Sequence, residues 1–327
     1  MILVTGGTGL VGANLLFYLS QKSYKIRATK RQKSRLENVL TVFKKYDSAN
    51  AKKYFDAIEW VETDLFEIPS LLDALEGVSQ VYHAAGMVSF SMNDHNQLKK
   101  VNKDGTFNLV NCCLKKQVKQ ICFVSSVAVL SEKDEQGYIN EDFGSNEENN
   151  YYGFTKTAAE MEIWRAAEEG MKVVIVNPSV ILGSGVKSKS SSMFFEKQKL
   201  LSHYPSGGTG FVDVRDVVTC CIELMEKEKF DHRYILNAEN KSYQEIFTQL
   251  RKEVHLSLPK KLGNWALDLF ILFIKIKSIF MGQNLTMNTI IYKNLKTQTK
   301  YSNKKISETL SYKFIPIEES IKFHSLK

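Results

Sequence analysis

The sequence contains few cysteines, and none of them has a spacing that suits a metal site. The five cysteines are Cys112, Cys113, Cys122, Cys220 and Cys221. An odd number that includes two pairs of neighbours is a poor basis for a disulfide framework, and no Cys-x-x-Cys spacing occurs. We therefore expect reduced thiols in the protein interior, no bound metal and a cytoplasmic protein.

Long runs of one charge and long uncharged apolar runs are also missing. The formal net charge is +8, but the basic residues are spread widely, which argues against a nucleic-acid-binding tail. The most apolar segment, residues 265–282, contains Asp268, Lys275 and Lys277, whereas a membrane-spanning helix needs about 20 mostly uncharged residues. We expect a buried or lid helix there, with little membrane contact. An apolar strand begins at residue 2, so no signal or transit peptide is expected.

Apolar runs of strand length alternate with segments of helical period through the first part of the chain. The predicted strands lie within residues 1–5, 24–31, 58–65, 78–86, 120–130 and 172–183. Because the connections are long enough for helices, this order predicts an α/β fold with a Rossmann-type, doubly wound parallel sheet. Residues 34–57 make a long connection that should contain one or two helices. Residues 210–225 are expected to return to the sheet as a strand and a helix.

A glycine-rich turn, "TGGTGLVG", follows the first strand and opens the first predicted helix. Such glycines let the backbone turn tightly and approach a pyrophosphate, which the N–H groups at the helix start can bind. The candidate cofactor contacts in this turn are Gly6, Thr8, Gly9, Leu10, Val11 and Gly12. Residues 1–182 with 211–238 are therefore predicted to form an NAD(P)-binding domain. Residues 183–210 with 239–327 should form a smaller, mostly helical substrate-binding lobe.

The end of the second strand, "RATKR", indicates which dinucleotide binds. NAD enzymes usually place an acid there for the ribose 2′-hydroxyl, and this strand end has none. Arg31 could make charge-assisted bonds to a 2′-phosphate instead, with Lys30 and Arg35 as helpers. NADP(H) is therefore favoured and NAD(H) remains possible. For Arg35, the alternative is an ordinary solvated residue at the start of a helix.

Two further strand ends carry candidate cofactor contacts. Asp64 could accept a hydrogen bond from the adenine amino group and Leu65 could cover the ring; the alternative for Asp64 is a helix N-cap. The small residues Ala84, Ala85 and Gly86 would admit a ribose at the edge of the sheet. His83, just before them, is expected to be a packed histidine and not a catalyst or metal ligand.

The chain resembles the extended short-chain dehydrogenase/reductase family, also called the NAD-dependent epimerase/dehydratase family, over its first ~240 residues. The resemblance rests on "TGGTGLVG", Asp64–Leu65, "HAAG" (83–86), "VNKDGTFNL" (101–109), "VSSVAV" (124–129), "YGFTK" (152–156), "NPSVILG" (177–183) and "FVDVRDV" (211–217). Within the family, the chain is most similar to the dihydroflavonol reductase and 3β-hydroxysteroid dehydrogenase branch. The last ~85 residues match no family pattern sharply.

The resemblance implies a Ser-Tyr-Lys catalytic site beside a nicotinamide. Tyr152 and Lys156 are four residues apart and so share one helix face, whereas Tyr151 lies about 140° from Lys156 around the helix. A nearby ammonium should lower the pKa of the phenol, so that the phenol can exchange a proton near neutral pH. The family's active hydroxyl falls on Ser126, and neighbouring Ser125 should point to the opposite face.

Three further roles follow from the resemblance. Asn102 would be a polar anchor near the site, although a helix N-cap is an equal alternative, and Pro178 should pass the nicotinamide. Asp213 and Asp216, with Arg215, are expected to be structural. A homodimer through the helices flanking the serine and tyrosine segments is a family-level expectation.

Three functions remain in view. The first is an NADP-dependent oxidoreductase that reduces the carbonyl of an apolar or aromatic small molecule, or oxidises the corresponding alcohol. The loop from Met87 to Met92 and the apolar segment near 269–279 would wall the substrate pocket. The second is an NAD-dependent nucleotide-sugar epimerase, which should have an acid at the end of the second strand. The third, a non-enzymatic NADP-sensing protein, is disfavoured by the Tyr-Lys pair.

Overall fold

The computed structural model describes residues 1–142, 151–186, 195, 200–263 and 295–325. The predicted apolar helix at 265–282 lies outside the described residues. None of the helices in the described part is long and apolar enough to span a membrane. The five cysteines are free and buried, as predicted for interior thiols.

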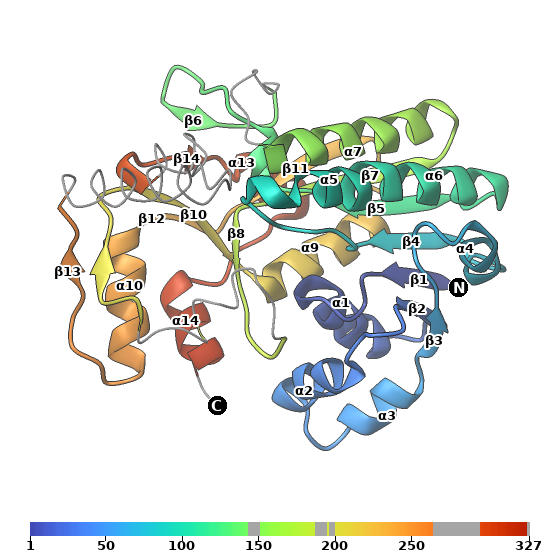
Figure 1. Ribbon diagram of the computed structural model, residues 1–327, viewed down its shortest axis with the longest axis horizontal. Helices are drawn as coiled ribbons and strands as arrows, with labels where there is room; N and C mark the ends of the chain where they lie inside the picture. The colour runs from blue at the N-terminus through green and yellow to red at the C-terminus, as the bar shows by residue number, and fades with distance from the viewer. Residues whose placement is uncertain (143–150, 187–194, 196–199, 264–294, 326–327) are drawn as a thin grey trace.

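A seven-stranded parallel sheet forms the centre of the molecule (Figure 1). Its order is β11-β7-β5-β4-β1-β2-β3. The strands are β1 (Ile2–Thr5), β2 (Ile26–Lys30), β3 (Glu59–Glu62), β4 (Gln80–His83), β5 (Gln120–Val124), β7 (Lys172–Pro178) and β11 (His232–Leu236). The chain order reverses between β1 and β4, which makes a switch point at the carboxyl end of β1. The predicted Rossmann-type sheet is confirmed.

Helices cover both faces of this sheet (Figure 1). One layer contains α1 (Leu10–Ser20), α2 (Leu36–Tyr46), α3 (Ala51–Asp56) and α9 (Val214–Glu226). The other contains α4 (Ile68–Ala74), α5 (His95–Leu98), α6 (Gly105–Lys115) and α7 (Tyr151–Glu168). The one or two helices predicted between residues 34 and 57 are confirmed as α2 and α3.

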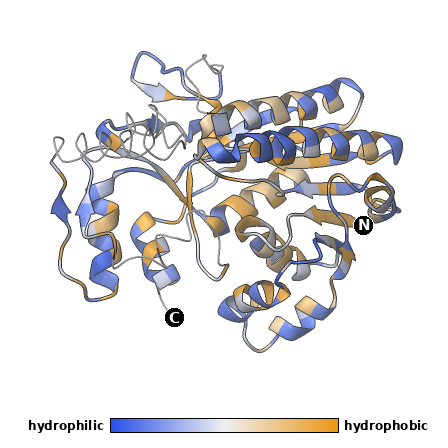
Figure 2. Ribbon diagram, viewed as in Figure 1, coloured by the Kyte–Doolittle hydropathy of each residue, from blue (hydrophilic) through white to orange (hydrophobic). Residues whose placement is uncertain are grey.

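Alternate strand residues feed two hydrophobic cores, one on each face of the sheet. Val4 and Tyr82 belong to the core that packs against α1, α2 and α9. Leu3, Val81 and Phe123 belong to the core that packs against α4, α6 and α7. The division follows from the two-residue period of a strand, and the sheet is correspondingly apolar in Figure 2.

A second, three-stranded sheet lies beside the C-terminal helices. Its order is β12 (Glu239–Ser242), β10 (Gly208–Asp213), β8 (Val180–Leu182). The single strand predicted over residues 172–183 is therefore wrong: it divides into β7 and β8. Pro178 has no N–H with which to extend the ladder, and the Ser179 N–H donates to Leu236 O at 3.0 Å as the chain leaves the central sheet.

The prediction that residues 210–225 return to the central sheet as a strand and a helix is only half right. The helix α9 does pack under that sheet, but β10 pairs with β8 and β12 instead. The remaining C-terminal helices are α10 (Tyr243–Glu253), α13 (Lys304–Leu310) and α14 (Ile317–Ser325). Short strands pair as β6 (Tyr138–Ile139) with β14 (Lys300–Tyr301), and β9 (His203–Tyr204) with β13 (Lys260–Lys261).

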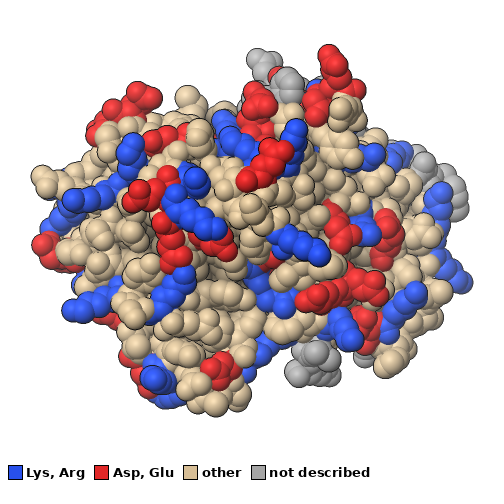
Figure 3. Space-filling view, turned by 180° about the vertical axis from the view of Figure 1, so that it is seen from behind, with Lys and Arg blue, Asp and Glu red and all other residues tan. Residues whose placement is uncertain are grey.

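Charged side chains of both signs are interspersed on the face shown in Figure 3. Many of the individual charges are neutralised locally in ion pairs, while the net excess of +8 stays spread over the molecule. Lys172 with Asp231 and Lys227 with Glu223 are examples, at 3.1 Å and 2.7 Å.

Candidate active site

The glycine turn joins β1 to α1 at the switch point of the sheet. Gly6 has a φ of +69°, and a Cβ on it would stand 2.6 Å from the Ala85 nitrogen. A Cβ on Gly12 would stand 2.1 Å from the Gly6 carbonyl oxygen, to which the Gly9 N–H donates at 2.9 Å. These close backbone contacts require glycine at positions 6 and 12. The turn directs the start of α1 towards the crevice, where helix N–H groups suit a phosphate.

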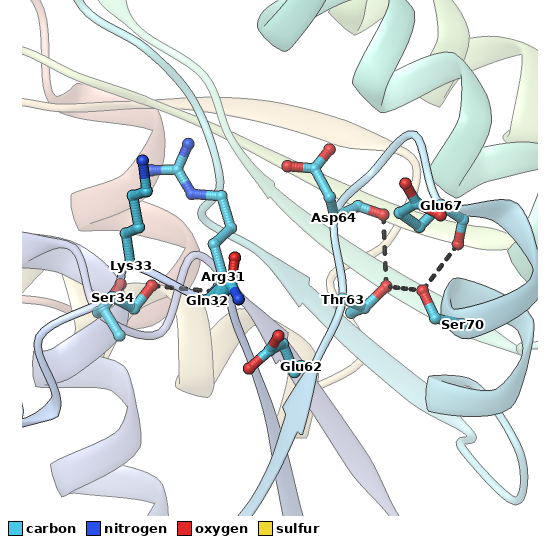
Figure 4. Close-up of a pocket in the computed structure, with 10 residues that line it drawn as sticks. Arg31, Gln32, Lys33, Ser34, Glu62, Thr63, Asp64, Glu67 and Ser70 are labelled. Carbon is cyan, nitrogen blue, oxygen red and sulfur yellow. Dashed lines mark hydrogen bonds between the residues drawn. The ribbon is translucent and has the colours of Figure 1, made fainter.

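A cavity of about 710 Å³ lies beside this turn, at the ends of β2 and β3 (Figure 4). It is lined by Thr8, Arg31, Gln32, Lys33, Ser34, Glu62, Thr63, Asp64, Glu67 and Ser70. In Figure 4, the Arg31 and Lys33 side chains lie on one side, with Asp64 and Glu67 on the other. The volume falls within the range of roughly 300–1,000 Å³ that is usual for small-molecule sites.

Of the three basic residues predicted to hold a 2′-phosphate, only Arg31 lines this cavity. The exposed Arg31 donates its main-chain N–H to Ser34 Oγ at 2.9 Å, which closes a turn directly after β2. Lys30 pairs with Glu62 at 3.7 Å, and Arg35 is the N-cap residue of α2. For Arg35, the structure therefore favours the alternative of a residue at the start of a helix.

Seven of the ten lining residues were missed from the sequence, and three of them, Gln32, Lys33 and Ser34, form one run. They follow Arg31 without a break, so extending the basic strand end into its turn could have found them. Lys33 adds a second cation beside Arg31. Phosphate recognition commonly combines a guanidinium fork with a lysine point charge.

Asp64 lines the same cavity and does not cap a helix. Its Oδ1 accepts from the Phe66 N–H at 3.1 Å, and the N-cap residue of α4 is Glu67. The N-cap alternative for Asp64 is therefore wrong. Leu65 packs under α6, since a Cβ on Gly105 would stand 2.9 Å from its Cδ1.

The groups at this edge of the sheet fit NAD(P). The start of α1 suits a diphosphate, the Asp64 carboxylate suits an adenine amino group, and Arg31 with Lys33 suits an additional phosphate. A Cβ at position 6 or 12 would fill the turn, so the shape of the proposed diphosphate-binding turn depends on glycine.

Tyr152, Ser126 and Lys156 come together where β5 ends and α7 begins. Tyr152 is the second residue of α7 and is buried, and the Ser126 side chain hydrogen-bonds to it. Lys156, one helical turn later and also buried, donates from Nζ to Val124 O at 2.8 Å. Its ammonium lies 4.1 Å from the centroid of the Phe123 ring. Three polar groups of different proton chemistry thus converge at one strand end.

The neighbouring Ser125 is arranged differently. Its Oγ is buried and has no hydrogen-bond partner among the described residues, whereas Ser126 also accepts from the Ala128 N–H at 3.2 Å. Ser126 is thus the hydroxyl directed at Tyr152.

The pKa of Tyr152 differs from the sequence-based expectation. Burial raises it to about 12, and the opposing effect comes from the Ser126 hydrogen bond, not from Lys156. The expected lowering by the ammonium is absent because burial outweighs the serine bond and Lys156, whose own pKa is about 7, has lost its charge at the pH where the phenol ionises. Burial also lowers the pKa of Lys156 to about 7, while the charge of Glu160 raises it.

Asn102 ties the loop after β4 to α7. Its Oδ1 accepts from the Met87 N–H at 2.8 Å, and its Nδ2 donates to Met87 O at 3.0 Å and to Thr155 Oγ1 at 3.1 Å. Asn102 lies inside the π-helical segment η2 (Lys99–Asp104), and Asp104 precedes α6. The N-cap alternative for Asn102 is therefore wrong, and the side chain anchors a loop beside Tyr152 and Lys156.

The small residues after β4 lead from the glycine turn to this cluster. The Gly6 turn touches the backbone of Ala84 and Ala85, and a Cβ on Gly86 would stand 3.9 Å from Lys156 Nζ. Pro178 ends β7, two strands from β4 across β5. The predicted cofactor residues after β4 and the catalytic candidates on α7 therefore lie next to each other.

His83 is a packed histidine, as predicted. Its Nδ1 lies 2.7 Å from Thr5 Oγ1 and its Nε2 lies 3.0 Å from Thr106 Oγ1. The ring is fully buried and stacks on Phe123. Burial, with a smaller effect of Lys156, lowers the pKa of His83 to about 3, so the ring is neutral at neutral pH.

Two aromatic residues border the tyrosine. Phe90, from the predicted Met87–Met92 wall, lies edge-on to the Tyr152 ring at 5.8 Å and is half exposed. Tyr151 stacks on His95 at 3.8 Å and so packs beside the site, as expected for the tyrosine without a catalytic role.

The predicted structural role of Asp213, Arg215 and Asp216 is confirmed. Asp213 caps α9 through the Arg215 N–H at 2.7 Å and pairs with the Arg215 guanidinium at 2.8 Å. It also lies 3.3 Å from His324 of α14. Asp216 accepts from Tyr312 at 2.8 Å. These bonds fasten the C-terminal segment to α9.

Sequence relatives of the chain include two plant reductases. Tetraketide alpha-pyrone reductase 2 of Arabidopsis thaliana is 30% identical over 270 residues, which cover 77% of this chain and 82% of that protein. Anthocyanidin reductase of Arabidopsis thaliana is 29% identical over 274 residues, which cover 74% and 77%.

The fold is shared with a solved epimerase. UDP-glucuronic acid 4-epimerase from Bacillus cereus, in complex with NAD, superposes with a TM-score of 0.74 and 18% identity, covering 99% of this chain and 97% of that chain. The family model described as NAD dependent epimerase/dehydratase family matches residues 2–238. The chain therefore belongs to the NAD-dependent epimerase/dehydratase family, the extended short-chain dehydrogenases/reductases.

Proposed function

We propose that the protein is an NADP-dependent oxidoreductase that reduces the carbonyl group of an apolar or aromatic small molecule, or oxidises the corresponding alcohol. The observation that carries this proposal is the convergence of Ser126, Tyr152 and Lys156 next to the glycine turn. The reductase relatives support the same reaction type.

The proposed chemistry divides between the cofactor and three side chains. NADP(H), when bound, supplies or accepts the hydride. Tyr152 would give its phenolic proton to the oxygen of the reduced carbonyl, and its pKa of about 12 keeps that proton in place at neutral pH. Ser126 would donate a hydrogen bond to the same oxygen and hold it in line.

Lys156 would stabilise the phenolate that remains after proton transfer. A buried ammonium close to a new negative charge lowers the free energy of the charged form. With a pKa of about 7, Lys156 also loses its own charge as the pH rises above neutrality. The proposed site should therefore work best at or below neutral pH in the reducing direction.

The preference for NADP rests on Arg31 and Lys33 at the cavity beside the glycine turn. The apolar substrate class rests on the exposed apolar side chains of the loop after β4, of which Phe90 lies edge-on to Tyr152. Val88, Phe90 and Met92 are 42%, 50% and 39% exposed, and exposed apolar groups beside reactive groups suit an apolar ligand.

The test is a matched pair of tyrosine variants. Tyr152→Phe should lower turnover of aromatic and apolar carbonyl compounds by about 10²- to 10⁴-fold, measured by the decrease in NADPH absorbance. The Kd for NADPH should stay within about twofold of the wild type. Tyr151→Phe removes a hydroxyl one residue away and should leave turnover unchanged. Full activity in Tyr152→Phe would contradict the proposed function.

A further inference from the structure

A buried carboxylate lies one helical turn beyond Lys156. Glu160 is 3% exposed, on the same helix α7, and its Oε1 accepts from Asn177 Nδ2 at 2.6 Å. Its Oε2 lies 3.7 Å from Arg233 Nη1 of β11. Burying a carboxylate is costly unless hydrogen bonds or opposite charges compensate, so this residue calls for a physical explanation.

Asn177 connects this carboxylate to the serine of the proposed site. The same Nδ2 group donates to Ser126 O at 3.1 Å and to Glu160 Oε1 at 2.6 Å. Both amide hydrogens therefore point to acceptors, which fixes the orientation of the amide. Asn177 itself is fully buried in β7. A chain of contacts thus runs from α7, across β7, to the main chain of Ser126.

Glu160 also acts on Lys156 through its charge. Residues four apart on a helix lie about 40° apart, on one face, and the negative charge of Glu160 is what opposes the effect of burial on the pKa of Lys156. Both side chains are almost completely buried, so solvent screens this interaction little.

The other ionisable groups around this pair do not supply a negative charge. His83 of β4 is neutral, because its pKa is lowered to about 3, and Tyr152 of α7 is neutral, because its pKa is raised to about 12. Arg233 is a cation, and its side chain is 26% exposed.

We propose that Glu160 is a positioning residue for the reaction: it is the counter-charge of Lys156 and, through Asn177, it holds Ser126 in place. The proposal rests on the proposed function for its catalytic meaning. Its two parts, the charge and the hydrogen bond, can be separated by substitution.

The charge is tested by titrating Lys156 directly, without turnover. In protein with ¹⁵N-labelled lysine side chains, the Lys156 signal is assigned from its loss in Lys156→Met. Glu160→Gln keeps an amide oxygen for Asn177 but removes the charge, and should move the Lys156 midpoint to lower pH by about one unit. Glu168→Gln removes an exposed carboxylate from the same helix and should not move the midpoint.

A Lys156 midpoint in Glu160→Gln that is unchanged or higher would overturn the proposal. Should that variant fail to fold, Glu160→Asp keeps a carboxylate but withdraws it by one methylene. The Lys156 midpoint should then fall by less than the shift expected for Glu160→Gln, and an unchanged or higher midpoint would equally refute the counter-charge.

The hydrogen bond is tested by comparing two variants in the full-length enzyme. Glu160→Gln should keep kcat at low pH, where Lys156 is charged. As the pH rises, this variant should lose activity at a lower pH than the wild type does. Glu160→Ala also removes the acceptor for Asn177, and should lower kcat at least tenfold across the whole pH range with the Kd for NADPH unchanged. Equal pH profiles for the two variants would refute the part played by Asn177. A wild type that reduces no carbonyl would refute the proposed function, while the titration would still report on Glu160.

Discussion

Replacing Gly12 with alanine should separate two opposing effects in the glycine turn. Alanine is favoured over glycine inside a helix by about 1 kcal/mol, and Gly12 is the third residue of α1. Against this, its Cβ would stand 2.1 Å from Gly6 O, 2.7 Å from Gly6 C and 2.9 Å from Gly7 Cα. All three are backbone atoms, so no side chain can rotate away. Overpacking of this kind costs about 1–3 kcal/mol, and the clash should prevail.

The expected result of Gly12→Ala is a loss of both stability and cofactor affinity. The free energy of unfolding, from urea titration, should fall by up to about 2 kcal/mol, which is the clash less the helix preference of alanine. The Kd for NADPH, from fluorescence titration, should rise about 10- to 100-fold, since one hydrogen bond to a charged group is worth about 1.5–3 kcal/mol. The displaced turn would lose at least one such bond to the pyrophosphate.

Gly9→Ala is the matched control for this experiment. A Cβ on Gly9 meets only Gly6 O, at 3.3 Å, so the unfolding free energy should stay within about 0.5 kcal/mol of the wild type. Cofactor affinity should still fall, because this glycine lets the backbone approach the pyrophosphate. Wild-type stability and affinity in Gly12→Ala would refute the argument from close contact.

Two further predictions concern cofactor choice and pH-dependent stability. Arg31→Asp should raise the Kd for NADPH about 10- to 100-fold with little effect on the Kd for NADH. The control Arg35→Asp, at a residue outside the cavity lining, should leave the Kd for NADPH unchanged. An equal rise in the Kd for both cofactors in Arg31→Asp would contradict the NADP assignment. Burial raises the pKa of Asp216 from 3.8 to about 7, against the Tyr312 hydrogen bond. Because this pKa is raised, the contribution of Asp216 to stability is present below about pH 4 and is lost as the pH rises through about 7. Urea titrations should give the change in unfolding free energy caused by Asp216→Asn at pH 8 and at pH 4. This change should be more stabilising at pH 8 by about 2–4 kcal/mol. An equal change at both pH values would contradict the raised pKa of Asp216.

The parts of the fold that sequence reasoning predicted are those with local causes. The strand–turn–helix unit around Gly6 and Gly12 is contiguous in the chain, so its period and its glycines are visible without tertiary information. Tyr152 and Lys156 are similarly recognisable because one helical turn separates them. Neither prediction required knowledge of which strands pair.

What sequence reasoning missed depends on contacts between distant residues. Strand β8 leaves the central sheet to pair with β10. The paired residues Val180 and Phe211 are 31 positions apart in the chain. The bond from Asn102 to Thr155 crosses 53 residues, and that from Asn177 to Ser126 crosses 51. Helical or strand periodicity carries no information about such pairs.

The pKa of Tyr152 shows why geometry alone was insufficient in the site itself. Helical spacing correctly places Tyr152 and Lys156 on one face, but proximity was taken to mean that the ammonium acts on the phenol. Burial raises the pKa of one group and lowers that of the other, so both neutral forms are favoured. On the proposed mechanism, a neutral phenol is the form that reduction requires, since it still holds the proton to be donated. The lysine is the group whose charge must be maintained near pH 7, and the buried carboxylate of Glu160 is placed to maintain it.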